Sequence, residues 1–217
     1  MSLALVVFDL DGTLIDSRRD LADAANALIV EHGGSPLAVD AIAGMVGEGA
    51  ALLVRRALSA AGVRLDVERD LRRFLELYDG GLLAHTALYG GTREMLEALM
   101  ARAPLAVLTN KPQHHTDAIL RGLDVARCFR WVIGGDTAHG RKPDPAGLRY
   151  LMSAAGSGPD DTVMIGDSAV DLKTARAARA RICLARYGFG YRTVEGRLDG
   201  TEWLIDRPCD LISLVSP

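Results

Sequence analysis

Six polar residues of this 217-residue chain follow short apolar runs, and their side chains suit ion binding and proton transfer. They are Asp9, Asp11, Thr109, Lys142, Asp167 and Asp171. Carboxylate oxygens are the ligands that Mg²⁺ prefers, while a lysine and a hydroxyl can hold the oxygens of a phosphate group. One carboxylate can attack phosphorus, and a second can transfer protons. The six residues therefore predict a site for Mg²⁺-assisted phosphoryl transfer, provided that the fold brings them together.

Asp9 and Asp11 follow residues 3–8, an unbroken apolar run that is too short for a helix. Such a run predicts a strand buried on both faces of a parallel sheet. Because side chains alternate along a strand, the two carboxylates should lie on the same side. Like charges this close raise each other's pKa unless a cation binds. Gly12 and Thr13 then form a turn, where backbone N–H groups can face an anion.

The elements that would bring the other residues to this strand are predicted along residues 89–217. Short apolar runs predict strands at 104–108, 131–133, 162–165 and 181–185, and a shorter one near 203–205. Helical spacing predicts helices at 93–101, before 122, at 145–155, at 172–180 and near 211. This alternation indicates an α/β fold with a parallel sheet of about five strands. Right-handed crossovers place every carboxyl end at one edge, where ligands bind such sheets.

Residues 16–88 differ, because helical spacing recurs there without a convincing strand. Helices are predicted from Ser17 to about 32, at 39–45, at 51–60 and at 66–83. Ser17, with Asp20 three residues later, has the pattern of a capping box. We therefore expect an α/β core of residues 1–15 and 89–217, with an all-helical domain of residues 16–88 inserted after the first strand.

The composition argues against several other classes of protein. A net charge of −3 provides no basic surface for nucleic acid, and aromatic residues, at 5%, are too few for base-stacking platforms. No apolar stretch approaches the roughly 18 residues of a membrane span, and no Lys/Arg-led signal segment begins the chain. Cys128, Cys183 and Cys209 form neither a zinc motif nor a disulfide framework. We expect a cytoplasmic monomer or homodimer that binds neither nucleic acid nor membranes.

Each candidate residue also has a simpler structural interpretation. Asp9 and Asp11 alone could be turn carboxylates, and Thr109 could cap the helix that follows it. Lys142 could be a solvated lysine, and Asp171 a first-turn carboxylate favoured by the helix dipole. The convergence of four strand ends on one small volume favours the catalytic interpretation.

Three further residues carry weaker signals. Lys111 is as consistent with a surface lysine as with a substrate contact. His114 and His115 invite a metal interpretation, but adjacent positions of a helix point apart, so we expect no metal site there. Tyr78 falls on the inward face of the helix at 66–83, where we expect it to pack in the core of the inserted domain.

Four segments resemble the four motifs of the haloacid dehalogenase (HAD) superfamily, in the same order and at reasonable spacings. They are Asp9-Leu-Asp-Gly-Thr13, Leu108-Thr-Asn110, Lys142-Pro-Asp-Pro145 and Gly166-Asp-Ser-Ala-Val-Asp171. The resemblance spans residues 3–184 and is specific, because all four motifs occur together. It implies a Rossmann-like parallel core with an inserted helical cap, which here is residues 16–88.

The resemblance also implies roles for individual residues. Asp9 would be the nucleophile and Asp11 the general acid and base. The ligands of Mg²⁺ would be Asp9, the backbone carbonyl of Asp11, and Asp167. Asp171 would either bind the ion or support a residue that does. The phosphoryl group would be held by Thr109 and Lys142.

In finer detail the chain is similar to the phosphoglycolate phosphatases of this superfamily. The similar segments are 46–50 leading into 55–58, 108–112, 132–136 and 187–190. This resemblance implies a small phosphorylated metabolite as substrate, most simply 2-phosphoglycolate. The residues expected to contact it are Gly12, Thr13, Asn110, Lys111, Gly47, Glu48 and Gly49. The glycines at 47 and 49 let backbone N–H groups approach a substrate carboxylate, whereas the charge of Glu48 should turn its side chain away.

Other activities of the superfamily fit the residues less well. Dehalogenases lack the second aspartate of the first motif, so Asp11 argues against dehalogenation. Phosphonatases use a cap lysine, and residues 16–88 contain none. Hydrolysis of pyrophosphate or a sugar phosphate, and a β-phosphoglucomutase-type transfer, stay open because these enzymes share the core. A phosphorylatable binding module similar to response-regulator receivers is disfavoured by the cap and by Asp11.

Overall fold

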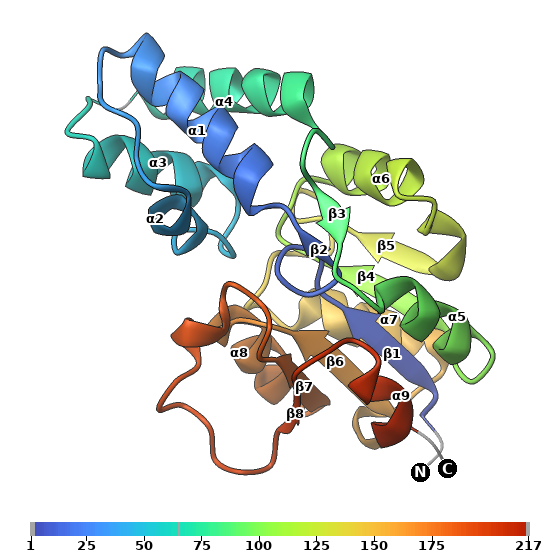
Figure 1. Ribbon diagram of the computed structural model, residues 1–217. Helices are drawn as coiled ribbons and strands as arrows, with labels where there is room; N and C mark the ends of the chain where they lie inside the picture. The colour runs from blue at the N-terminus through green and yellow to red at the C-terminus, as the bar shows by residue number, and fades with distance from the viewer. Residues whose placement is uncertain (1–2, 65, 216–217) are drawn as a thin grey trace.

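The computed structural model describes residues 3–64 and 66–215, and a parallel sheet of six strands lies at its centre (Figure 1). The strands are β1 (Leu5–Phe8), β4 (Leu105–Leu108), β5 (Trp131–Ile133), β6 (Thr162–Gly166), β7 (Arg181–Ala185) and β8 (Trp203–Ile205). Their order is β5-β4-β1-β6-β7-β8, which makes β1 central. The α/β fold is confirmed, and the short strand predicted near 203–205 joins the sheet as its sixth strand by pairing with β7. The ends of the expected core, residues 1–2 and 216–217, lie outside the described residues.

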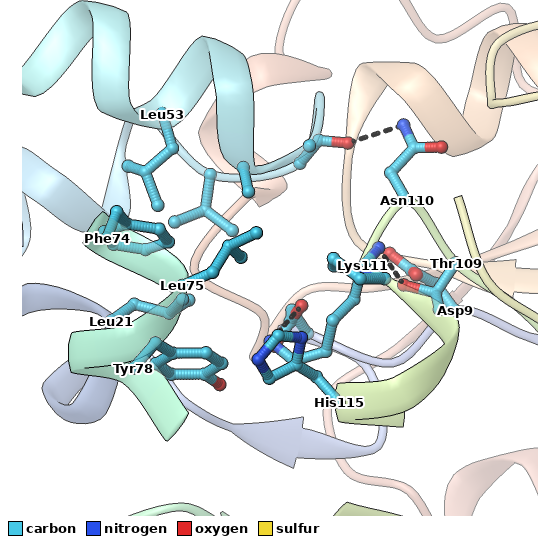
Figure 2. Close-up of a pocket in the computed structure, with 16 residues that line it drawn as sticks. Asp9, Leu21, Leu53, Phe74, Leu75, Tyr78, Thr109, Asn110, Lys111 and His115 are labelled. Carbon is cyan, nitrogen blue, oxygen red and sulfur yellow. Dashed lines mark hydrogen bonds and ion pairs between the residues drawn. The ribbon is translucent and has the colours of Figure 1, made fainter. Parts of the chain in front are cut away.

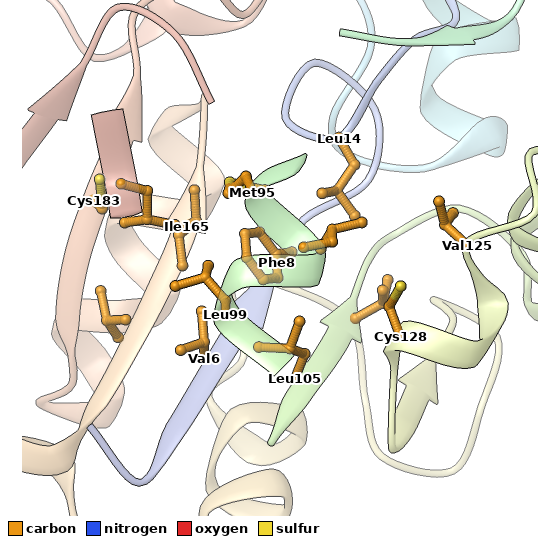
Figure 3. Close-up of a cluster of buried hydrophobic side chains, with 14 of the residues drawn as sticks. Val6, Phe8, Leu14, Met95, Leu99, Leu105, Val125, Cys128, Ile165 and Cys183 are labelled. Atoms are coloured by element: carbon orange, nitrogen blue, oxygen red, sulfur yellow. The ribbon is translucent and has the colours of Figure 1, made fainter. Parts of the chain in front are cut away.

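Helices cover both faces of the sheet. Val6 and Phe8 of β1 belong to one apolar cluster, whereas Leu5 and Val7 belong to another on the opposite face. The first cluster packs against α5 (Thr92–Met100), α6 (Gln113–Gly122) and α9 (Asp210–Leu214), and Figure 3 shows Leu99 of α5 beside Val6 and Phe8. The second packs against α7 (Ala146–Ala155) and α8 (Ala169–Ala178). Short 3₁₀ turns occur at Ala126–Cys128, Pro159–Asp161 and Tyr191–Thr193. Burial on both faces explains why the strands are almost continuously apolar.

A second group of helices lies beyond the carboxyl edge of the sheet (Figure 1). It consists of α1 (Arg18–Glu31), α2 (Val39–Ala43), α3 (Ala50–Ala60) and α4 (Val67–Gly81). Leu21 and Leu28 of α1 share a buried apolar cluster with Phe74 and Tyr78 of α4, and this cluster is distinct from the two of the sheet. Over residues 3–64 and 66–215, no helix combines the length and the apolar character that crossing a bilayer requires.

Two short strands connect these helices to the sheet. β2 (Ile15–Asp16) and β3 (Ala87–Leu88) form an antiparallel pair, with Ile15 opposite Leu88 and Asp16 opposite Ala87. The prediction that residues 16–88 hold no strand is therefore wrong at both ends. Strands of two residues are too short for an alternating pattern to be recognised in the sequence.

The expected capping box of α1 is also wrong, although Ser17 does occupy the N-cap position. The Ser17 hydroxyl donates to Asp11 Oδ1 at 2.5 Å rather than to its own helix. The buried Asp20 accepts hydrogen bonds from the backbone N–H groups of His85 and Thr86, both at 2.9 Å, and from the Thr86 hydroxyl at 2.6 Å. Asp20 thus links the first turn of α1 by hydrogen bonds to residues 85–86, which lead back to the sheet.

Candidate active site

The carboxyl ends of neighbouring strands bring the candidate catalytic residues to one place. Parallel pairing sets Phe8 of β1 opposite Val107 of β4 and Ile165 of β6, so these strands end side by side. Asp9 follows β1, Thr109 follows β4 and Asp167 follows β6. Two more residues arrive from the loop between β5 and α7 and from the first turn of α8. The buried set is Asp9, Thr109, Lys142, Asp167 and Asp171.

Three of the expected metal ligands form a carboxylate cluster. One oxygen from each of Asp9, Asp167 and Asp171 lies within 4.8 Å of the others, and all three residues are buried. Burial raises the pKa of Asp9 to about 6, against the lowering effect of Lys142. Burial and the charges of Asp171 and Asp9 raise the pKa of Asp167 well above its usual range. Carboxylate oxygens held this close fit a divalent cation such as Mg²⁺, because the ion would offset their repulsion.

Lys142 neutralises part of the carboxylate cluster. Its Nζ lies 2.8 Å from Asp9 Oδ1 and 2.6 Å from Asp171 Oδ1. Burial opposes the charge on Lys142, but Asp171 and Asp9 outweigh burial and raise its pKa. The interpretation of Lys142 as a solvated lysine is therefore wrong. Asp171 also accepts the Ser168 N–H and hydroxyl in a capping box, so α8 begins at Ala169 rather than at 172 as predicted.

Asp11 points away from the carboxylate cluster, toward the inserted helices. Lys111 Nζ lies 3.0 Å from its Oδ1 and 3.1 Å from its Oδ2, and the Ser17 hydroxyl donates to Oδ1. Lys111 is buried, and although burial opposes its charge, Asp11 raises its pKa. Lys111 therefore belongs to the site and not to the surface. The metal contact through the backbone carbonyl of Asp11 stays a prediction.

Gly12 lies against the carboxylate cluster, and Thr13 contacts the loop after β7. Gly12 has a φ of +84°, and a Cβ at this position would overlap the Asp167 carboxylate, so only glycine allows this close approach. The Thr13 carbonyl accepts a hydrogen bond of 2.9 Å from the Tyr187 hydroxyl. The loop after β7 also holds the cluster directly, because the Gly190 N–H donates to Asp167 Oδ2 at 2.7 Å.

Comparison with known proteins places this geometry in a family. The family described as haloacid dehalogenase-like hydrolase matches residues 6–185. The chain belongs to this family. The predicted superfamily is therefore confirmed, and the four motifs that indicated it are those that meet at the sheet edge.

Relatives of this HAD hydrolase include two curated proteins named phosphoglycolate phosphatase. The protein from Rhodospirillum rubrum is 44% identical over 197 residues, which cover 87% of this chain and 82% of the relative. The protein from Pseudomonas putida is 39% identical over 195 residues, which cover 86% and 71%. The crystal structure of a predicted phosphoglycolate phosphatase from Haemophilus somnus matches with a TM-score of 0.91 at 30% identity, covering 100% of this chain and 99% of that chain.

A cavity of about 40 Å³ lies between the HAD core and the inserted helices, beside Asp9 and Asp11 (Figure 2). The core contributes residues 109–112 and His115 to its wall. The inserted helices contribute mainly apolar side chains, namely Leu21, Leu53, Phe74 and Leu75, together with Tyr78. The core and the helices thus enclose a small space whose wall includes Asp9, Asp11 and Thr109.

The loop at residues 46–50 forms part of the cavity wall, where substrate contacts were expected. Gly47 and Gly49 line the cavity, and Asn110 Nδ2 holds the loop by donating to the carbonyls of Gly47 and Lys142, both at 2.9 Å. Glu48 is outside the wall, because its carboxylate pairs with Arg56 Nη2 at 2.5 Å. Its side chain turns away from the cavity, as its charge led us to expect. Gly12 and Thr13 also lie outside the wall.

Tyr78 and His115 line the cavity, although sequence reasoning assigned neither to the site. Their ring centroids are 5.2 Å apart, across the junction between α4 and α6. Tyr78 was correctly expected to point inward. Helical spacing identifies the buried face of a helix but does not tell which element covers that face. No signal in the sequence therefore distinguished these two residues from ordinary packing residues.

Proposed function

We propose that this HAD hydrolase releases phosphate from 2-phosphoglycolate, with Mg²⁺ as cofactor and a phosphorylated Asp9 as intermediate. The observation that carries the proposal is the position of the Asp9 carboxylate, which lies in the carboxylate cluster, beside Lys142 and in the wall of a small cavity. The names of the R. rubrum and P. putida relatives support the choice of substrate.

The residues around Asp9 support a two-step reaction. An oxygen of Asp9 attacks phosphorus, and the bond from phosphorus to the leaving oxygen breaks. Thr109 and Lys142 orient the phosphoryl oxygens, and Lys142 offsets the charge that develops on them. Mg²⁺ bound at the carboxylate cluster would supply further positive charge to these oxygens. Asp11 gives a proton to the leaving oxygen and later takes one from the water that releases phosphate from Asp9.

We also propose that residues 16–88 act as a cap over a core of residues 1–15 and 89–217. These helices have an apolar cluster of their own, and they form the wall of the cavity that faces the core. Closure would exclude water while Asp9 attacks. The hydrogen bond from Asn110 to the Gly47 carbonyl joins the cap to the core in the closed arrangement, while the bond from Asn110 to Lys142 lies within the core.

Phosphate release from a panel of phosphate esters with Mg²⁺ tests the proposed substrate. The kcat/KM for 2-phosphoglycolate should exceed that for pyrophosphate and for hexose phosphates by about 10²-fold or more, because a shaped polar site rejects poorly matched groups strongly. Isomerisation of a sugar phosphate without phosphate release would instead indicate a phosphomutase. Stable phosphorylation of Asp9 without turnover of any ester would contradict an enzymatic role and indicate a binding module.

Adding Mg²⁺ to protein freed of metal should raise the melting temperature. At 100 times its Kd, a ligand that binds only the folded state stabilises it by about 2.7 kcal/mol, which for a chain of this size corresponds to roughly 5–10 °C. Asp167→Asn should remove both this response and the activity. Asp160→Asn, at an exposed position outside the site, should keep both. A melting temperature that does not respond to Mg²⁺ would contradict the proposed metal site.

We further propose that the protein works in the cytoplasm. Cys128, Cys183 and Cys209 are all free thiols, and thiols persist in a reducing compartment. Within the proposed function its partner is a small phosphorylated metabolite. The alternatives of a monomer and a homodimer stay predictions from the sequence.

A further inference from the structure

The cavity between core and cap is lined by a buried tyrosine hydroxyl. Tyr78 is 2% exposed, and its Oη forms no hydrogen bond of ordinary geometry within the described part of the chain, although the Lys111 ammonium lies close enough to interact with it. Buried polar groups are nearly always paired, so one that lines a cavity indicates a ligand with polar atoms. The two-step reaction proposed above leaves this hydroxyl without a role.

Lys111 lies between that hydroxyl and the residues of phosphoryl transfer. Its Nζ is 3.0 Å from Asp11 Oδ1 and 4.7 Å from the centre of the Tyr78 ring. Figure 2 shows the rings of Tyr78 and His115 close to the Lys111 side chain. A substrate with its phosphorus at Asp9 and its leaving oxygen at Asp11 would extend from there toward Lys111 and Tyr78.

The ammonium group of Lys111 provides a positively charged donor in this part of the cavity, where it also pairs with Asp11. Of the described residues that line the cavity, Lys111 is the one cation at neutral pH, since burial lowers the pKa of His115. A lysine ammonium and a tyrosine hydroxyl can both donate hydrogen bonds, and a carboxylate accepts through two oxygens. Leu53 and Phe74 of the cap exclude water from the wall, which strengthens such bonds.

The size of the cavity limits the leaving group. Its volume is about 40 Å³, and one water needs at least roughly 10 Å³ on this scale. The space therefore admits only a small ligand. One methylene with a carboxylate suits this space, whereas a hexose ring does not.

We propose that Lys111 of the core and Tyr78 of the cap form a carboxylate subsite, which selects phosphate esters that carry a carboxylate one carbon from the ester oxygen. The subsite rests on the proposed phosphatase function and deepens it. It moves the expected carboxylate contact from the backbone of residues 46–50 to two side chains. Because one of these belongs to the core and the other to the cap, a bound carboxylate would also hold the cap closed.

Tyr78→Phe tests the subsite, because it removes one oxygen and keeps the ring beside Lys111. The kcat/KM for 2-phosphoglycolate should fall about 10- to 100-fold, which is the loss expected for a hydrogen bond to a charged group. The kcat/KM for ethyl phosphate, which has two carbons but no carboxylate, should change less than about twofold. The melting temperature should stay equal or rise, because the substitution removes an unpaired polar atom from the interior.

Tyr89→Phe is a matched control. The Tyr89 hydroxyl is likewise buried without a partner among the described residues, but Tyr89 is not part of the cavity wall, so this variant should keep both activities. If Tyr78→Phe lowers kcat/KM equally for both substrates, or does not lower it for 2-phosphoglycolate, the proposed subsite is wrong. The proposed phosphatase function would not be affected by either result. A wild-type protein that hydrolyses ethyl phosphate but not 2-phosphoglycolate would refute the proposed substrate itself.

Discussion

Asp9→Asn should reduce phosphate release by about 10⁴-fold or more, because the asparagine amide cannot attack phosphorus. The pKa of Asp9 is raised only to about 6, so the wild-type carboxylate is ionised and nucleophilic at neutral pH. The variant should still fold. Asparagine has the same shape, keeps an oxygen for Lys142, which lies 2.8 Å away in the wild type, and removes one negative charge from the carboxylate cluster.

Two measurements separate the loss of the nucleophile from a loss of structure. The melting temperature of Asp9→Asn without metal should match or exceed that of the wild type. Wild-type protein quenched in acid during turnover should carry covalent phosphate, and the variant should carry none. Asp160→Asn, at an exposed position, serves as the control for the charge change. An Asp9→Asn variant with a near wild-type rate would refute the proposed mechanism.

Lys142→Met should lower both stability and activity. Lys142 is buried between Asp9 and Asp171, with Nζ 2.8 Å and 2.6 Å from their oxygens. Without the lysine, two buried carboxylates lose their compensating charge, and breaking a buried ion pair in this way typically costs about 3–5 kcal/mol of unfolding free energy. In the proposed mechanism Lys142 contacts the phosphoryl oxygens, so its loss should reduce kcat by about 10²- to 10³-fold. Denaturant unfolding in EDTA and steady-state kinetics in Mg²⁺ measure the two effects.

The two effects of Lys142→Met should respond differently to metal. Mg²⁺ should restore part of the stability, because the ion supplies positive charge to the carboxylates, while the lost contact to the phosphoryl oxygens should keep kcat low. Lys173→Met, on the exposed side of α8, is the matched control and should behave like the wild type. A Lys142→Met protein as stable as the wild type in EDTA would contradict the role of Lys142 in compensating Asp9 and Asp171.

The positions of Asp9, Thr109 and Asp167 could be predicted from the sequence because all three residues lie at the carboxyl ends of strands that run in the same direction. Each of them directly follows a short apolar run, and parallel pairing brings the ends of such runs to one edge of the sheet. Lys142 has a weaker signal, since it lies in a loop after β5, and there the Pro-Asp-Pro segment that follows it decided the prediction. These residues need only the topology of the sheet to come together.

The contacts between cap and core could not be predicted in this way. Tyr78 was recognised as an inward residue, but its position facing Lys111 depends on how α4 sits over the core. Ser17 and Asp20 have the local pattern of a capping box, yet tertiary partners replace the local ones, because their oxygens bond equally well to distant groups. The placement of one domain on another leaves no periodic pattern in the sequence.

The chain leaves the core and returns to it at neighbouring points, because β2 and β3 are paired. Because the two ends of the inserted segment are adjacent, the core does not need the segment to span any fixed distance. The entropic cost of closing such a loop rises only slowly with its length. Evolution can therefore lengthen, shorten or replace the segment between Asp16 and Ala87 without moving Asp9 or Lys142. The carboxylate cluster can thus stay in place while the segment that covers it changes.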